Sequence, residues 1–275
     1  MCEDKEADTM DHTFKPLFQG DSLQGWRVFP RGISRFREGS PEYLEACLHP
    51  GLWTINDGII EGRQDPPGSG FGSYLVSEAT YGDFELVYEA KPDWPADTGV
   101  YVHASEDGTV GYQILLDHRK SGSIGGFYGN AIGGFHAINW NVDAEYDQDG
   151  QAIAIKIEDP ATTLEPITPD KPALLTNKIS GDEFLKLWNW NDWNEFRVVC
   201  TGRFPKLSTY INGVLVASID MAAVDSPKFD KDRAAQLGSK GHIAFEVHDN
   251  DPGMGESRWG KTAACRWRNV RIREL

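Results

Sequence analysis

The sequence lacks long hydrophobic runs. No window of its 275 residues approaches the ~18 consecutive apolar residues of a transmembrane helix, so no membrane span is predicted. Cysteine is also scarce, and Cys2, Cys47, Cys200 and Cys265 show no CxxC or Cys/His spacing, which argues against a structural zinc site. Cys200 and Cys265 lie in strand-like runs, where they either pair as a disulfide or remain buried thiols.

Positive charge is outnumbered by negative charge. The chain has 27 Lys and Arg residues against 42 Asp and Glu residues, a formal net charge of −15. A field of this sign repels phosphate backbones and anionic lipid, so nucleic acid is excluded as a partner. Several catalytic and cofactor motifs are missing as well: the GxSxG elbow, the P-loop, the dinucleotide glycine fingerprint, HExxH and the EF-hand loop.

Helical periodicity is rare, and after residue 13 the chain consists of short alternating runs between clusters of Gly, Asp, Asn and Pro. The runs 84–91, 99–104, 111–117 and 241–249 each place apolar side chains on one face and mostly polar ones on the other. Residues 209–218 hold an Asn-Gly pair between two apolar runs, which predicts a hairpin with a type I′ turn. The pattern predicts an all-β fold, a two-sheet antiparallel β-sandwich.

This sandwich is predicted to span residues 14–275 as a single domain, after a disordered or linker N-terminus at 1–13. Loop insertions are predicted near 30–50 and 130–190, where no periodicity runs through the sequence. The residues expected between the sheets are Phe84, Leu86, Ile114, Phe196, Ile211 and Phe245.

Two short stretches favour helix: 41–48, and 180–190, where Ser180 and Glu183 form a capping-box signature. The glycine-rich run 122–135 lacks the strand–turn–helix context of a phosphate cradle, so it is interpreted as a flexible loop or a tight crossing at the rim. Tryptophan is abundant. Trp53, Trp193 and Trp267 are predicted in the core, and Trp94, Trp140 and Trp259 in loops, where an exposed indole can stack on a sugar ring.

The polar faces of the four alternating runs carry an unusual set of side chains. It combines histidines, carboxylates, an amide and a tyrosine, which suits acid–base chemistry or the recognition of sugar hydroxyls. If these strands are neighbours, their polar faces form one cleft. The residues predicted on the outward faces are Glu89, Lys91, Tyr101, His103, Gln113, Asp117, Glu246 and His248.

The order of the segments resembles the 3-keto-disaccharide hydrolase domain family. The resemblance begins at FKPLFQGDSLQGWRV (14–28) and continues through TGVYVHA (98–104), GYQILLD (111–117) and GGFYG (125–129) to GHIAFEVHD (241–249) and the C-terminal strand. It implies a concanavalin A-like lectin/glucanase sandwich, a jelly roll. It also implies an exported bacterial protein, periplasmic, secreted or a surface lipoprotein, and Cys2 is a candidate for a lipid anchor.

The family resemblance implies a carbohydrate-active enzyme that cleaves glycosidic bonds. A ketone at carbon 3 acidifies the hydrogen at carbon 2, so a base can remove that proton and expel the glycosidic oxygen, after which water adds. Such a site needs a base, an acid for the leaving oxygen and an electrophile for the enolate, which can be a Lys, a Tyr or a divalent metal. The candidates are His103 or His248 as base, Glu246 or Asp117 as acid, and Lys91 or Tyr101 as electrophile.

Two alternatives remain open at this point. His248, Glu246 and Asp117 could instead hold a divalent metal, and the chain could be a non-catalytic, lectin-like module that binds glycans. The residues predicted to contact an oligosaccharide or glycoside are Glu89, Lys91, Tyr101, Gln113 and Tyr128. His248→Ala or Glu246→Gln is expected to abolish turnover, because each removes a candidate acid or base. The melting temperature is expected to change little, because a solvated strand face tolerates substitution.

Overall fold

The computed structural model describes residues 13–275. Strands account for 43% of the chain and helices for 11%, which confirms the predicted all-β class. The predicted N-terminal linker, apart from Thr13, and Cys2 with its candidate lipid anchor lie outside the described residues. No helix within residues 13–275 is long and apolar enough to cross a membrane.

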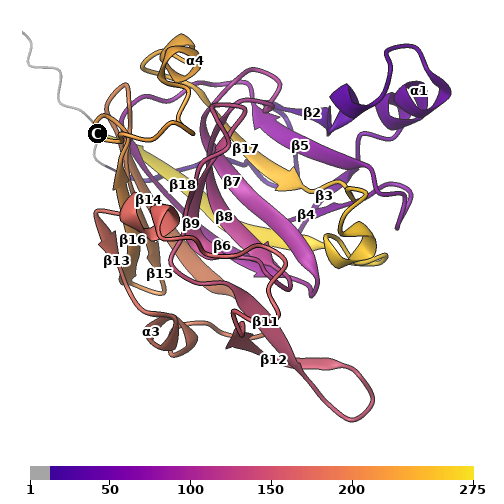
Figure 1. The fold of residues 1–275 in the computed structure, drawn as a ribbon. Coiled ribbons are helices and arrows are strands. Elements are labelled where there is room, and N and C mark those ends of the chain that lie inside the picture. The colour runs from indigo at the N-terminus through magenta and orange to yellow at the C-terminus, as the bar shows by residue number, and fades with distance from the viewer. Residues whose placement is uncertain (1–12) are drawn as a thin grey trace, which may run out of the picture.

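Two antiparallel sheets lie one over the other (Figure 1). The first, sheet A, has the strand order β13 (Asn177–Lys178), β16 (Val214–Asp220), β15 (Lys206–Ile211), β14 (Asn194–Thr201), β6 (Phe84–Pro92), β18 (Cys265–Glu274), β4 (Ile59–Arg63) and β3 (Leu52–Asn56), with β1 (Lys15–Pro16) also paired to β18. The second, sheet B, has the order β10 (His136–Ala137), β9 (Ile124–Asn130), β8 (Gly111–His118), β7 (Ala96–Ala104), β17 (His242–Val247), β5 (Gly72–Ser77) and β2 (Trp26–Arg31).

The remaining elements decorate this sandwich. A separate two-stranded ribbon extends from one end of it (Figure 1). Its strands are β11 (Val142–Tyr146) and β12 (Ala152–Ile157). The helices are η1 (Ile33–Arg35), α1 (Pro41–Leu48), α2 (Asp170–Ala173), α3 (Gly181–Leu185), α4 (Lys231–Gln236) and η2 (Gly255–Ser257).

The apolar faces of the alternating strands form the core between the sheets. All six predicted core residues are fully buried: Phe84, Leu86, Ile114, Phe196, Ile211 and Phe245. Phe245 of sheet B packs against Trp267 of sheet A, with ring centroids 5.2 Å apart. The area that such aromatic rings remove from water is the main stabilising contribution to a sandwich of this kind.

The local turn and cap signals are confirmed. Asn212 and Gly213 both adopt positive φ between β15 and β16, as the hairpin prediction requires. α1 spans the predicted residues 41–48, and α3 begins at the capping box of Ser180 and Glu183. These features depend on residues next to one another in sequence, which is why the sequence predicted them.

The glycine-rich run was interpreted wrongly. Residues 124–130 form β9, a strand of sheet B whose register against β8 shifts once, rather than a loop or a crossing at the rim. Its glycines make room for close neighbours: a Cβ on Gly129 would lie 2.3 Å from the ring of Phe135, and one on Gly126 would lie 2.7 Å from the carbonyl oxygen of Ala137. Glycine in a strand interior here marks close packing.

Three tryptophans differ in burial from their prediction, and two cysteines remain unpaired. Trp140 and Trp259, predicted in exposed loops, are buried, whereas Trp193, predicted in the core, is half-buried beneath the guanidinium of Arg268. Cys200 and Cys265 are buried free thiols, one of the two predicted alternatives.

Candidate functional site

A small cavity opens on the outer face of sheet B. It has a volume of about 150 Å³, below the ~300–1,000 Å³ of drug-sized pockets. β8 contributes every second residue to its floor, because Ile114 and Leu116 point into the core. The lining residues are Arg31, Asp97, Gln113, Leu115, Asp117, Arg119, Tyr128, His136, Glu165, His248 and Arg258.

Two carboxyl groups lie opposite each other on the cavity floor. Asp97 of β7 and Asp117 of β8 are direct cross-strand partners, and their side chains share a hydrogen bond. Two carboxylates this close cannot both ionise easily in a buried site. One oxygen of Asp117, Oδ1, has no protein hydrogen-bond partner within residues 13–275.

The surroundings assign different protonation states to the two carboxyls. Burial opposes the ionisation of Asp97, but the positive charges of Arg119 and Arg258 outweigh it and hold the pKa of Asp97 well below its usual range. Both guanidiniums donate to Oδ2 of Asp97, each at 2.5 Å. Burial, and then the charge of Asp97, raise the pKa of Asp117 well above its usual range. The surroundings therefore favour an ionised Asp97 beside a protonated Asp117.

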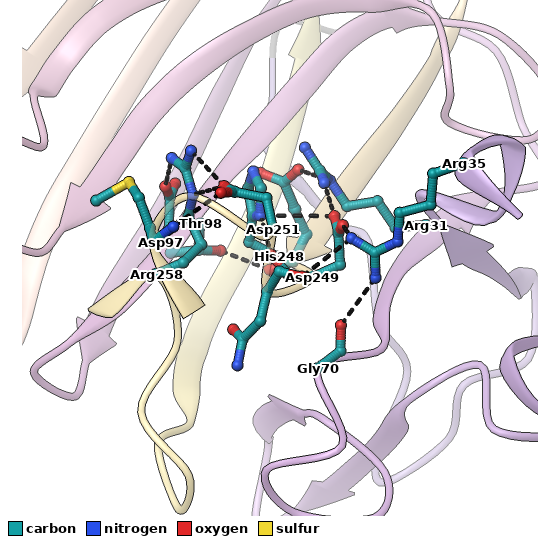
Figure 2. Close-up of polar contacts among 12 residues, drawn as sticks. Arg31, Arg35, Gly70, Asp97, Thr98, His248, Asp249, Asp251 and Arg258 are labelled. Carbon is teal, nitrogen blue, oxygen red and sulfur yellow. Dashed lines mark hydrogen bonds and ion pairs between the residues drawn. The ribbon is translucent and has the colours of Figure 1, made fainter. Parts of the chain in front are cut away.

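The two arginines are held in place by further carboxylates. Nη2 of Arg119 donates to Oε2 of Glu165 at 3.2 Å, and Nε of Arg258 donates to Oδ2 of Asp251 at 2.9 Å. Figure 2 shows Arg258 between Asp97 and Asp251. These contacts hold both guanidiniums in place, so the positive charges of Arg119 and Arg258 keep Asp97 ionised.

A buried glutamate organises the other side of the cavity. Glu246 of β17 is fully buried and accepts three hydrogen bonds, from Nε of Arg31 (2.5 Å), the hydroxyl of Tyr101 (3.0 Å) and Nε2 of Gln113 (2.6 Å). Burial raises the pKa of Glu246, and Arg31 partly offsets that rise. Both of its oxygens are engaged, so Glu246 positions Arg31 and Gln113, which line the cavity.

Gly99 allows this arrangement. Gln113 lies on β8 and Glu246 on β17, so the side chain of Gln113 must cross the intervening strand β7 at Gly99. A Cβ on Gly99 would lie 2.6 Å from Nε2 of Gln113 and 2.8 Å from the carbonyl oxygen of Ile114. No other residue fits at this position without displacing Gln113.

Arg31 keeps one free donor at the cavity. Its Nε binds Glu246, and its Nη1 binds Asp249, which also pairs with Arg35 (Figure 2). Nη2 of Arg31 donates to no residue between 13 and 275. Arg31 therefore presents a fixed positive charge with the two unused N–H groups of Nη2.

His248 is a neutral imidazole in this setting. Burial, and then the positive charge of Arg31, lower the pKa of His248 well below its usual range. Nδ1 lies 2.6 Å from the carbonyl oxygen of Asp249, so Nδ1 carries the proton and donates it. Nε2 is then unprotonated and bonds to no residue in the described part of the chain, which makes it available as a base.

An aromatic pair forms another wall of the cavity. The rings of Tyr128 on β9 and His136 on β10 lie with centroids 4.5 Å apart, and both are half-buried. Burial, and then Lys171, lower the pKa of His136 to about 4, so this ring is also neutral. Such a wall suits the apolar face of a sugar ring.

A family model matches almost the whole chain. Residues 13–273 match the family model described as the 3-keto-alpha-glucoside-1,2-lyase-like domain. The chain belongs to this family. The resemblance found in the sequence is confirmed, and it places the chain among carbohydrate-active proteins.

Solved structures resemble this chain at low identity. Two are proposed glycosyl hydrolases from Parabacteroides distasonis ATCC 8503. The first is 17% identical, the match covers 96% of this chain and 100% of that one, and the TM-score is 0.48. The second is 15% identical, the match covers 95% of this chain and 94% of that one, and the TM-score is 0.49. A carbohydrate-binding module, CBM66 from Bacillus subtilis, is 14% identical over 91% of this chain and 96% of its own, with a TM-score of 0.42. No curated protein sequence matches the chain.

The fold of this family member brings some of the predicted residues together. Gln113, Asp117, Tyr128 and His248 line the one cavity, and Tyr101 and Glu246 lie in the hydrogen-bond network beside it. Their catalytic and binding roles stay predictions. The premise of a solvated strand face was wrong for Glu246, which is buried, so its replacement is expected to affect stability as well.

His103 is not in the cavity, and its predicted role in this site was wrong. Its φ is 46°, and the pairing of β7 with β17 shifts register at this point. Ala104 therefore takes the place on the outer face, beside Tyr101, that alternation gave to His103. Nε2 of His103 instead contacts the carbonyl oxygen of Gly82 at 3.3 Å.

Glu89 and Lys91 were also assigned to the wrong place. Both lie on β6, which pairs with β14 and β18 in sheet A. Their side chains point away from the core on the opposite side of the sandwich, and Glu89 pairs there with Arg268. The alternation of 84–91 gave the correct outward face, but on the other sheet.

The candidate metal set is not assembled. Residues 13–275 contain no group of three or more His, Cys, Asp or Glu side chains arranged to hold a metal ion. Among the candidate ligands His248, Glu246 and Asp117, the oxygens of Glu246 accept hydrogen bonds from three donors, so this donor set does not fit a metal.

Several residues of the site were missed. Asp97 shares its face with Tyr101, so continuing the alternation of 99–104 by two residues toward the N-terminus would have found it. Continuing the alternation of 111–117 by two residues toward the C-terminus would likewise have found Arg119, whereas Arg31 and Arg258 carried no such signal. Arg31 and Arg258 come from distant segments, at the end of β2 and in the loop before β18.

Proposed function

We propose that this chain is an enzyme that cleaves the glycosidic bond of a 3-keto-glycoside by elimination, followed by addition of water. The observation that carries the proposal is the buried pair Asp97 and Asp117, directly opposite each other in one cavity with His248 and Arg31. The surroundings lower the pKa of Asp97 and raise that of Asp117, and burial lowers the pKa of His248. Pairs of titratable groups with opposed pKa shifts in a cavity are typical of acid–base catalysis. The family name, which describes a 1,2-lyase, supports the same chemistry.

The roles follow from the protonation states. Nε2 of His248 removes the proton from carbon 2, and the electron pair forms an enolate whose oxygen, at carbon 3, is stabilised by Arg31. The enolate then collapses: the double bond forms between carbons 1 and 2, and the bond from carbon 1 to the glycosidic oxygen breaks. Asp117 gives its proton to the leaving oxygen. Asp117 then takes a proton from water, the resulting hydroxide adds at carbon 1, and His248 returns a proton to carbon 2, which gives a free 3-keto sugar.

A substrate pair tests this proposal. Purified protein is expected to release the aglycone from a methyl 3-keto-glucoside and not from the parent methyl glucoside, because only the ketone acidifies the hydrogen at carbon 2. In D2O the released 3-keto sugar is expected to carry deuterium at carbon 2, measured by NMR.

Other outcomes would contradict it. Equal turnover of both glycosides indicates an ordinary glycosidase, and binding of both without turnover indicates the lectin-like alternative.

The pH dependence gives a second test. Because the pKa of His248 is lowered well below its usual range, kcat/KM is expected to stay level as the pH falls through ~6.5, where a free histidine base would be protonated. Because the pKa of Asp117 is raised, kcat/KM is expected to fall only when the pH rises through this raised pKa, where Asp117 loses its proton. The measurement is a pH profile of kcat/KM between pH 4 and 10. A loss of rate centred near 6.5 would remove His248 from its assigned role.

A further inference from the structure

A second, larger cavity lies near the end of β8. Its volume is about 360 Å³. β8 separates it from the first cavity, because Asp117 and Arg119 line the first while the residue between them, His118, lines the second. Two half-buried tryptophans, Trp94 and Trp190, form part of its wall. The site proposed above uses none of these rings.

The rings of Trp94, Trp190 and His118 form a fixed aromatic surface. The centroids of Trp94 and Trp190 are 5.8 Å apart with an interplanar angle of 50°, and the ring of His118 lies 5.1 Å from each of them. Nε1 of Trp94 donates to the hydroxyl of Tyr146 on the β11–β12 ribbon at 3.1 Å, which fixes the indole. Tilted, partly exposed indoles of this kind bind the apolar face of a pyranose ring.

His118 supplies an unused acceptor. Its Nδ1 lies 2.9 Å from the carbonyl oxygen of Asp93 and carries the proton, so Nε2 is an acceptor. Burial lowers the pKa of His118 to about 4, which keeps the ring neutral. Nε2 is buried without a partner in the described residues. A buried acceptor of this kind is stabilised by a donor, such as a sugar hydroxyl.

Polar groups at the rim complete the site. The side chains of Gln151, Asn191 and Thr262 are exposed at the cavity and make no hydrogen bond within residues 13–275. The charge of Asp93 is already paired with Arg266 at 2.8 Å. Aromatic faces with amide and hydroxyl groups around them match a ring that is apolar on one face and carries hydroxyls at its edge.

We propose that this cavity is a second carbohydrate-binding site, which holds a neutral pyranose ring of an oligosaccharide against Trp94 and Trp190. The inference rests on the proposed function only in taking a sugar as the ligand. It requires no catalytic role for Asp117 or His248. Its test therefore uses intact oligosaccharides, which carry no 3-keto group.

The probes are cellotetraose, maltotetraose and laminaritetraose, titrated into the full chain by calorimetry. At least one is expected to bind, with Trp190→Ala weakening binding about tenfold through the lost stacking. Gln151→Ala, an exposed change that leaves the fold intact, is expected to weaken it about threefold through a lost hydrogen bond. Trp193→Ala is the matched control, because this half-buried indole lies under Arg268 and outside the cavity.

The outcomes separate this proposal from the enzymatic one. Asp117→Asn is expected to bind the tetrasaccharide as wild type does, which places the ligand outside the first cavity. If binding depends on Trp190 and no 3-keto-glycoside is turned over, the second binding site is supported and the proposed enzymatic function is contradicted. The second site is overturned if no tetrasaccharide binds, or if Trp190→Ala and Gln151→Ala bind as tightly as Trp193→Ala.

Discussion

Asp117→Asn is expected to lower kcat for an alkyl 3-keto-glycoside by about 10²–10⁴-fold, the usual loss when a general acid is removed. The amide keeps the shape of the side chain but cannot give a proton to the leaving oxygen. Stability is expected to hold, because the change removes a buried carboxyl group that lies beside ionised Asp97. Steady-state kinetics and a denaturation curve measure the two effects.

The leaving group provides the sharper comparison. A 4-nitrophenyl 3-keto-glycoside has an aglycone that departs as a stable anion and needs little help from an acid, so the loss in Asp117→Asn is expected to be far smaller for it. An equal loss for both substrates would mean that Asp117 positions the sugar and donates no proton. Asp143→Asn is the matched control, because Asp143 lies on β11, outside the cavity, where it pairs with Lys120.

Glu246→Gln is expected to reduce the free energy of unfolding by about 3–5 kcal/mol, the range for breaking a buried ion pair, because Glu246 itself is fully buried. Three donors, from Arg31, Tyr101 and Gln113, share the carboxylate. An amide offers one acceptor oxygen and turns its own N–H groups toward at least one of these donors. Urea denaturation measures the change, and kcat/KM is expected to fall with it, because Arg31 and Gln113 line the cavity.

Glu89→Gln is the matched control for this prediction. Glu89 also accepts a hydrogen bond from the Nε of an arginine, Arg268, but it lies on the outer face of sheet A with 21% of its side chain exposed. Partly exposed ion pairs contribute at most about 1 kcal/mol. Equal losses in the two variants would show that the Glu246 network does not contribute as a buried ion pair.

Part of the site could be predicted because alternation is local. Residues 111–117 alternate strictly, so Gln113 and Asp117 had to share a face opposite Ile114. The same rule put Glu246 opposite Phe245, and the Asn-Gly pair fixed the hairpin of β15 and β16. The rule failed at His103, where a bulge adds one residue and changes the parity of the strand, and no residue type signals that bulge.

The sequence by itself determined the strands, their buried faces and the family, since all three depend on patterns read along the chain. Only the tertiary structure decided that β6 lies in sheet A, which removes Glu89 and Lys91 from the site. It also decided that Arg258 reaches Asp97 and that Arg31 lines the same cavity. Sheet order and loop paths depend on contacts between distant segments, whereas sequence periodicity reports only which face of a single strand is buried. Protonation depends on the same contacts: Asp97 and Asp117 are the same residue type, and neighbouring charges make one an anion and the other an acid.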